Sequence, residues 1–248
     1  MRAVLQHIHS LKSQGKKAFA ILIDPDKVPV SECAALASNI NAAGVDFVFI
    51  GGSLLVNDNI RRVIPELKRL VDVPVIVFPG NLLQLSTEAD ALLFLSVISG
   101  RNPEMLIGNH VVAAPILKAA GIEVLPTGYL LIDTGRATSV HYMSNTQPIP
   151  YDKADIAACT AMAGELLGLQ LIYLDGGSGA EKTISTEMVS AVADSVEVPL
   201  IVGGGIRSRK QAEAILKAGA DIIVVGNALE DRSETSLFRD LPALIANF

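Results

Sequence analysis

The hydrophobic positions of this sequence fall into two patterns that alternate along the chain. Short aliphatic runs without polar alternation are typical of strands buried on both faces, as in a parallel sheet. Apolar residues three and four positions apart are typical of amphipathic helices. The runs that predict strands cover residues 18–23, 47–50, 75–78, 91–95, 123–125, 171–174, 200–202 and 222–225. The helical pattern covers residues 2–13, 31–43, 54–71, 103–120, 152–167, 186–194, 209–218 and 237–246.

Eight strands that alternate with helices predict an α/β protein with one domain, a (β/α)₈ TIM-like barrel over residues 1–248. The third helix should be degenerate, because the connection from Asn81 to Ala91 is too short for a full helix. Pro65 should kink or split the helix predicted over residues 54–71. The longest irregular stretch, residues 128–151, is expected to extend the fifth strand, and a connection of this length is usually functional.

Three of the last predicted strands end in glycine-rich loops, at residues 176–179, 203–205 and 226. Glycine lets several backbone N–H groups approach one anion, and a following helix adds its own unpaired N–H groups. In (β/α)₈ barrels the loops after the last strands are a recurrent phosphate site. Any one of these loops is equally well explained as the simple end of a strand. Three in succession favour a phosphate-binding cup at the carboxyl ends of the strands.

Composition narrows the class of protein. Hydrophobic residues make up 50% of the 248 residues and charged residues 19%, which indicates a globular chain with a large core. A net charge of −6, 4% aromatic residues and no Trp argue against nucleic-acid binding. Cys33 and Cys159 have no partner spacing and are expected to be reduced core residues. No apolar run is long enough to span a membrane and no signal peptide is apparent, so we expect a cytoplasmic protein.

Polar side chains follow the first three predicted strands, at the end of a barrel where active sites lie. Asp24, Asp26 and Lys27 follow the first strand, Ser53 the second and Asn81 the third. Asp24 and Ser53 would offer oxygen ligands from adjacent strands, which suits Mg²⁺ that shares its coordination with water and substrate phosphate. The alternative is that Asp24 caps the turn before a proline and Ser53 caps the next helix.

Asp175 lies at the entrance to the predicted cup, where it could bind substrate hydroxyl groups or act as a base. The alternative is an Asx turn that closes the loop. Lys27 could neutralise a diphosphate or be a solvated turn residue. His110 is expected to be structural, whereas His141 is a possible groove residue, and the histidines share no metal-binding spacing.

Five motifs, taken together and in this order, resemble the geranylgeranylglyceryl phosphate synthases, relatives of the heptaprenylglyceryl phosphate synthases. They are LIDPDK (22–27), GGS (51–53), YLDGGSGA (173–180), VGGGIRS (202–208) and VVGNALE (224–230). The segment from residue 129 to 158 resembles the second group of that family, which has bacterial and archaeal members.

The resemblance implies transfer of a geranylgeranyl group from its diphosphate to the 3-hydroxyl of sn-glycerol 1-phosphate, with release of pyrophosphate. It also implies a barrel whose third helix is replaced, a homo-oligomer assembled through outer helices, and Mg²⁺ bound by Asp24 and Ser53. Asp175 and Lys27 would be the catalytic residues. The glycerol phosphate would bind Tyr173, Leu174, Asp175, Gly176, Gly177, Ser178, Gly179, Gly204, Gly205, Gly226 and Asn227.

One motif departs from the family pattern. Relatives usually carry YLEAGSGA where this chain has Asp175 and Gly176, so a shorter carboxylate must reach the glycerol hydroxyls.

Two other kinds of function remain open. One is a different phosphate-binding barrel enzyme, such as a flavin oxidoreductase, a sugar-phosphate isomerase or an aldolase. An aldolase is disfavoured because no lysine lies at a strand end in the second half of the barrel. The other is a non-catalytic protein that binds prenyl or glycerol phosphates.

Overall fold

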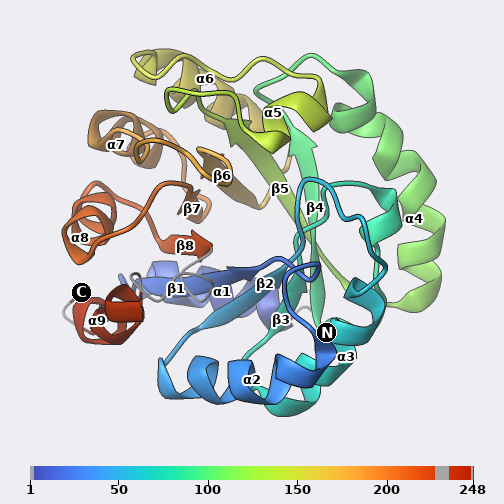
Figure 1. The fold of residues 1–248 in the computed structure, drawn as a ribbon. Coiled ribbons are helices and arrows are strands. Elements are labelled where there is room, and N and C mark those ends of the chain that lie inside the picture. The colour runs from blue at the N-terminus through green and yellow to red at the C-terminus, as the bar shows by residue number, and fades with distance from the viewer. Residues whose placement is uncertain (1–2, 227–234, 247) are drawn as a thin grey trace.

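The structure, a computed structural model, describes residues 3–226, 235–246 and 248. The chain forms a closed barrel of parallel strands that is surrounded by helices (Figure 1). The strands are β1 (Ala18–Ile23), β2 (Phe47–Ile50), β3 (Val75–Val77), β4 (Ala91–Val97), β5 (Glu123–Leu131), β6 (Leu171–Asp175), β7 (Leu200–Gly203) and β8 (Ile222–Gly226). They pair in chain order, and β8 closes the barrel against β1, where Ala18 pairs with Ile222. The predicted TIM-like barrel is confirmed.

The helices follow the strands as the pattern predicted, with one gap. They are α1 (Ala3–Ser13), α2 (Cys33–Ala42), α3 (Ile60–Leu70), α4 (Asn109–Ala120), α5 (Ser139–Ser144), α6 (Ala154–Leu166), α7 (Thr186–Ala193), α8 (Arg209–Lys217) and α9 (Thr235–Ile245). Three short turns are η1 (Val30–Glu32), η2 (Leu82–Gln84) and the π-helical η3 (Glu104–Gly108). The connection from β3 to β4 contains only η2, so the degenerate third helix is also confirmed.

Alternate side chains of each strand point into the barrel and outward to the helices. On β6, Tyr173 belongs to the cluster inside the barrel, whereas Ile172 and Leu174 pack in the layer between strands and helices. Both layers are buried, which explains why the strands lack polar alternation in the sequence. The same alternation directs Tyr173 and Asp175, two positions apart, toward the barrel axis.

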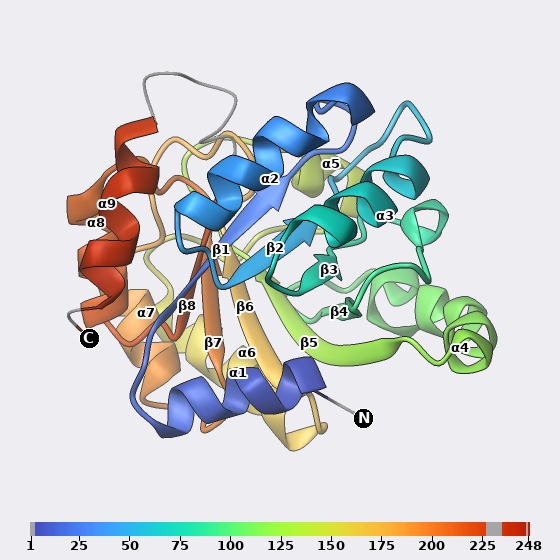
Figure 2. The ribbon, with the colours of Figure 1, turned by 90° about the horizontal axis from the view of Figure 1, so that it is seen from below.

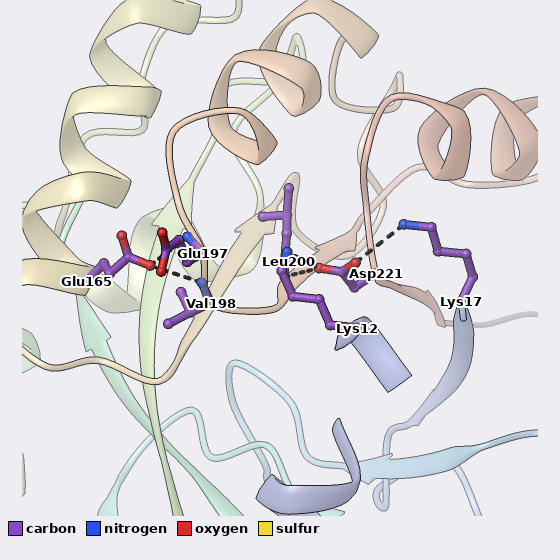
Figure 3. A network of polar contacts seen from close by, with 7 residues as sticks. All are labelled: Lys12, Lys17, Glu165, Glu197, Val198, Leu200 and Asp221. Carbon is purple, nitrogen blue, oxygen red and sulfur yellow. Dashed lines mark hydrogen bonds and ion pairs between the residues drawn. The ribbon is translucent and has the colours of Figure 1, made fainter. Parts of the chain in front are cut away.

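The end of the barrel where the strands begin is closed by α1, which lies across it (Figure 2). Val4, Leu5 and Ile8 of α1 join the inner cluster, and the Glu123 carboxylate accepts hydrogen bonds from the backbone N–H groups of Val4 and Leu5. Asp221 also holds this end of the barrel together. Its carboxylate accepts hydrogen bonds from the ammonium groups of Lys12 and Lys17 and from the Leu200 N–H (Figure 3). Substrates therefore have access from the opposite end, where the strands finish.

The structure corrects several expectations about local structure. The helix predicted over residues 54–71 is α3, which starts at Ile60. It is not split at Pro65, because four of its apolar residues are buried against the core. Within the irregular stretch, β5 continues to Leu131 and a short helix, α5, forms. Cys33 is buried as expected, but Cys159 lies on the exposed face of α6 rather than in the core.

Candidate active site at the strand ends

A cavity of about 340 Å³ opens at the carboxyl ends of the strands. Its polar part is lined by residues from β1, β2 and β6 and the loops that follow them, including Asp24, Lys27, Ser53, Asp175 and Ser178. The apolar part of the lining comes mainly from η2, β4, η3 and α4, and we call this part of the cavity the apolar arm. The arm is lined by Leu82, Leu85, Leu92, Leu93, Phe94, Leu95, Val97, Met105, His110 and Ala113. The cavity therefore has a polar part and an apolar part.

Asp175 ends β6 and is nearly buried, at 8% exposure. Its Oδ2 accepts a hydrogen bond from the Tyr129 hydroxyl at 2.7 Å, and its Oδ1 accepts from the Gly177 N–H at 2.7 Å. Burial raises the pKa of the Asp175 carboxyl, while the two hydrogen bonds oppose that rise. The hydrogen bond from the Gly177 N–H closes an Asx turn, which the sequence analysis gave as the alternative role of Asp175. The bond to Tyr129 is an additional contact that holds the carboxylate toward the cavity.

Tyr129 of β5 was not singled out from the sequence. The barrel register places it directly beside Tyr173, and the two rings lie 5.6 Å apart. Phe78 completes the cluster, 5.3 Å from Tyr173 and 6.2 Å from Tyr129. Burial and the nearby Asp175 carboxylate raise the pKa values of both tyrosines well above the ordinary value. Both phenols therefore stay protonated, and Tyr129 acts as a hydrogen-bond donor.

The glycine loops after β6 and β7 lie against each other. The Gly176 N–H donates to the Gly203 carbonyl, and a Cβ at Gly204 would lie 2.7 Å from the Gly176 nitrogen. Gly177 also has a positive φ of 80°. The two loops can lie this close only because these residues have no side chain. The predicted phosphate cup depends on the same property of glycine. Gly205 lies in the loop after β7 and Gly226 is the last residue of β8, whereas Asn227 lies outside the described residues.

The remaining members of the predicted glycerol phosphate set have different orientations. Tyr173 points into the barrel and Ser178 is exposed in the cavity wall. The Leu174 side chain is fully buried in the layer beneath the helices, so it faces away from the cavity. Leu174 can contribute only its backbone to a bound ligand.

The predicted metal ligands come together at the β1 and β2 loops. A Cβ at Gly52 would lie 3.8 Å from the Asp24 carboxylate, and Ser53 follows directly in the cavity wall. Asp24 Oδ1 accepts from the Asp26 N–H at 3.0 Å, so the predicted turn cap is present, while its Oδ2 lies 3.8 Å from Lys27 Nζ. Ser53 does not cap the next helix, because that helix starts at Ile60.

Asp26 has a different role from its neighbours in the same motif. Its carboxylate accepts hydrogen bonds from the backbone N–H groups of Val56 and Asn57. Asp26 therefore holds the β2 loop against the β1 loop, and it does not line the cavity.

Gln84 joins the β2 and β3 loops beneath the cavity. Its buried side chain donates to the Gly52 carbonyl at 2.7 Å and accepts from the Gly80 N–H at 3.0 Å. The single turn η2 supplies this residue, so the degenerate helix leaves space for the cavity and still anchors its edge.

His110, expected from the sequence to be structural, is one of the residues that line the apolar arm. Its ring packs edge-on against Phe94 at 4.4 Å, and Nε2 lies 3.3 Å from the Ser96 hydroxyl. Burial lowers the pKa of His110, so the ring is neutral at physiological pH and adds no charge to the arm. His141, the possible groove residue, does not line the cavity.

Comparison with known proteins gives the family of this chain. Residues 12–241 match the PcrB family. The chain belongs to this family. A geranylgeranylglyceryl phosphate synthase from Chitinophaga pinensis is 56% identical over 93% of this chain and 90% of its own length. The corresponding protein from Spirosoma linguale is 50% identical over 97% of this chain and 96% of its own.

Solved structures of PcrB relatives agree with the sequence comparison. The (S)-3-O-geranylgeranylglyceryl phosphate synthase from Thermoplasma acidophilum, solved with sn-glycerol-1-phosphate, is 34% identical over 99% of both chains, with a TM-score of 0.92. The N-acetylmannosamine-6-phosphate 2-epimerase from Clostridium perfringens, at 14% identity and a TM-score of 0.58, shares only the fold. The resemblance drawn from the sequence motifs is therefore confirmed.

Across residues 3–226 and 235–246, none of the helices has both the length and the hydropathy needed to cross a bilayer. In the same part of the chain, no three His, Cys, Asp or Glu side chains gather into a group that could hold a metal ion.

Proposed function

We propose that this protein transfers a geranylgeranyl group from geranylgeranyl diphosphate to the 3-hydroxyl of sn-glycerol 1-phosphate. The observation that carries the proposal is the position of Asp175, where the glycine loops meet the cavity. A phosphorylated acceptor bound to those loops would place its hydroxyl beside the Asp175 carboxylate. The apolar arm belongs to the same cavity as this carboxylate and would hold the prenyl chain.

The apolar arm matches the chemistry of the donor. A prenyl chain is stabilised on binding mainly by removal of CH₂ groups from water, at about 0.8 kcal/mol for each group. The arm offers aliphatic and aromatic walls from β4 and α4, together with a neutral histidine. A sugar-phosphate isomerase has no use for such an arm, which favours prenyl transfer over that alternative.

Asp24 and Ser53 are the residues that would hold Mg²⁺. A carboxylate and a hydroxyl are hard oxygen ligands, and both line the cavity, where water and diphosphate oxygens can supply further ligands. When bound there, Mg²⁺ stabilises the negative charge that develops on the diphosphate. Lys27, which also lines the cavity, would add its positive charge at the same end of the donor.

The reaction itself follows from the arrangement of the protein groups. The bond between the allylic carbon and the diphosphate oxygen breaks, and the diphosphate leaves with the electron pair. The acceptor hydroxyl oxygen forms the new bond to that carbon, and Asp175 accepts its proton. Tyr129 keeps the Asp175 carboxylate oriented, and the acceptor phosphate fixes the distance between the hydroxyl and the carbon.

We further propose that the protein is a cytoplasmic homo-oligomer. The outer face of α4 exposes aliphatic side chains, with Val111 at 65%, Val112 at 58% and Ile116 at 54% exposure. Several exposed apolar side chains on one helix favour association with another protein, here a second copy. The two cysteines are free, which agrees with a reducing compartment.

The test is an assay of lipid product with sn-glycerol 1-phosphate and prenyl diphosphates of different chain length, with and without Mg²⁺. We expect Mg²⁺-dependent formation of prenylglyceryl phosphate and pyrophosphate, and loss of activity in Asp24→Ala. The exposed Asp72 provides a control, since Asp72→Ala should keep activity. Binding of both ligands without any product would instead support a non-catalytic protein.

A further inference from the structure

The connection between β5 and α6 returns to cover the glycine loop of β6. Ile132 and Ile149 form a parallel bridge that closes the base of this connection. The Thr134 hydroxyl donates to the Gly176 carbonyl at 3.1 Å, and the Thr138 hydroxyl lies 2.5 Å from where a Cβ at Gly177 would be. The segment from residue 134 to 138 is therefore fixed directly against the predicted phosphate cup.

Arg136 is the cationic residue of this covering segment. Its Nη2 lies 2.6 Å from where a Cβ at Gly179 would be, so the guanidinium rests on the backbone of the glycine loop. The side chain is exposed, and within the described residues it forms no hydrogen bond and no ion pair. Glu181 approaches Gly135 in the same segment, yet its carboxylate is not paired with Arg136.

Two other cations near this loop are engaged elsewhere. The Arg207 guanidinium donates to the backbone carbonyls of Ala180 and Glu181. The Lys182 ammonium lies over the Tyr151 ring, 3.4 Å from its centroid. Arg136 thus differs from both, because its donors are directed to neither a carbonyl nor a ring.

The position of Arg136 decides which substrate it would meet. Ser178 and Asp175 line the cavity, whereas Arg136 and Gly179 do not. The predicted diphosphate end of the cavity lies at the β1 and β2 loops, whereas Arg136 lies over the β6 loop. Arg136 is therefore on the side of the glycine loops and the acceptor.

We propose that Arg136 binds the phosphate group of the acceptor and closes the phosphate cup from above. The inference rests on the proposed function, because it assigns one residue to the acceptor of that reaction. A guanidinium presents a planar fork of donors to two phosphate oxygens, which backbone N–H groups on the opposite side complement. Arg136 would thus select a phosphorylated acceptor over free glycerol.

The experiment compares Arg136→Gln and Arg136→Lys with the wild-type enzyme in steady-state kinetics. Loss of a charge-assisted hydrogen bond should raise KM for sn-glycerol 1-phosphate about 10-fold or more in Arg136→Gln, with kcat nearly unchanged. KM for the prenyl diphosphate should not change. Arg136→Lys should be intermediate, because it keeps the charge without the fork. Arg62→Gln, which removes an exposed arginine on α3, is the control and should match wild type.

Calorimetric titration of sn-glycerol 1-phosphate into each variant separates this inference from the proposed function. If the wild-type protein makes no lipid product but Arg136→Gln still binds the acceptor more weakly, the inference stands and the transferase proposal fails. If product forms and acceptor KM is unchanged in Arg136→Gln, the inference is wrong. A change confined to the donor KM would also overturn it, because Arg136 would then belong to the diphosphate. Thermal unfolding of each variant confirms that the comparison is made between folded proteins.

Discussion

Asp175 combines a structural and a chemical role in one side chain. Both of its oxygens are fixed by hydrogen bonds, one from the Tyr129 hydroxyl and one from the Gly177 N–H. The Asx turn keeps Oδ1 in the loop, so Oδ2 and its remaining lone pair face the cavity. Burial that raises the pKa of this carboxyl also makes it a better base once it is ionised.

Tyr129→Phe should weaken catalysis without disturbing the fold. The hydroxyl of Tyr129 stabilises ionised Asp175, so its loss should raise the Asp175 pKa further. We expect kcat/KM to fall by about 10- to 100-fold, and its acidic limb to move to higher pH. Rate measurements across a pH series check both effects. Tyr142→Phe, at an exposed position on α5, should leave the profile unchanged, and an unshifted limb in Tyr129→Phe would contradict the assigned role.

Asp175→Asn should separate stability from activity. The pKa of the Asp175 carboxyl in the folded protein is raised above its ordinary value of 3.8, so folding favours the protonated carboxyl. The stability that this side chain contributes is therefore fully present below pH 3.8, and it is lost as the pH rises through the pKa of the folded protein. The wild-type protein should therefore lose stability relative to Asp175→Asn over this window. At neutral pH the variant should be at least as stable but inactive. Denaturant unfolding of both proteins from acidic to neutral pH measures the difference, and a constant difference would argue against the raised pKa.

The starts of the strands share an arrangement that the carboxyl ends do not have. Asp46, Asp90 and Asp221 each precede an even-numbered strand. Each carboxylate accepts a backbone N–H from the first or second residue of the strand before it. The residue before β6 is Gln170, which is not acidic. Near the start of β7, the Glu165 carboxylate from α6 accepts hydrogen bonds from the Glu197 and Val198 N–H groups (Figure 3). Charged side chains thus fix one end of the barrel, which leaves the other end for the active site.

Asp221→Ala should destabilise the barrel through this arrangement. Its nearly buried carboxylate accepts from Leu200 and pairs with Lys12 and Lys17, all of which would lose a partner. We expect the free energy of unfolding to fall by about 2–4 kcal/mol. Chemical denaturation provides the measurement. Asp72→Ala at the same end, where the side chain is exposed, should change it by less than about 0.5 kcal/mol.

The inner and outer sides of helix α4 carry different sets of residues. Its inner side carries His110 and Ala113, which line the apolar arm, and its outer side exposes Val111, Val112 and Ile116. In Figure 1 this helix covers the barrel beside β4, next to the region where the third helix is reduced to η2. The wall of the proposed prenyl site and the proposed contact between subunits are therefore opposite faces of one element.

Replacing Val112 with Glu and Ile116 with Lys should dissociate the proposed homo-oligomer. The two charges are four residues apart and can pair along the helix, so α4 should remain folded. Light scattering after size-exclusion chromatography should show a smaller mass than for wild type. The same pair of charges at Met162 and Leu166, exposed on α6, is the matched control and should leave the mass unchanged. An unchanged mass in the α4 variant would show that this face is not the contact.

The sequence alone determined the barrel, its reduced third helix and the glycine loops, because these depend on local patterns of burial and backbone freedom. It also placed Asp24, Ser53 and Asp175 at one end, since all parallel strands finish there. Only the tertiary structure decided which residues meet. Tyr129 reaches Asp175 across 46 positions because β5 and β6 pair in one register, and Arg136 reaches Gly179 because the connection after β5 folds back. Such contacts depend on the closed barrel and its loops, which no periodicity along the chain encodes.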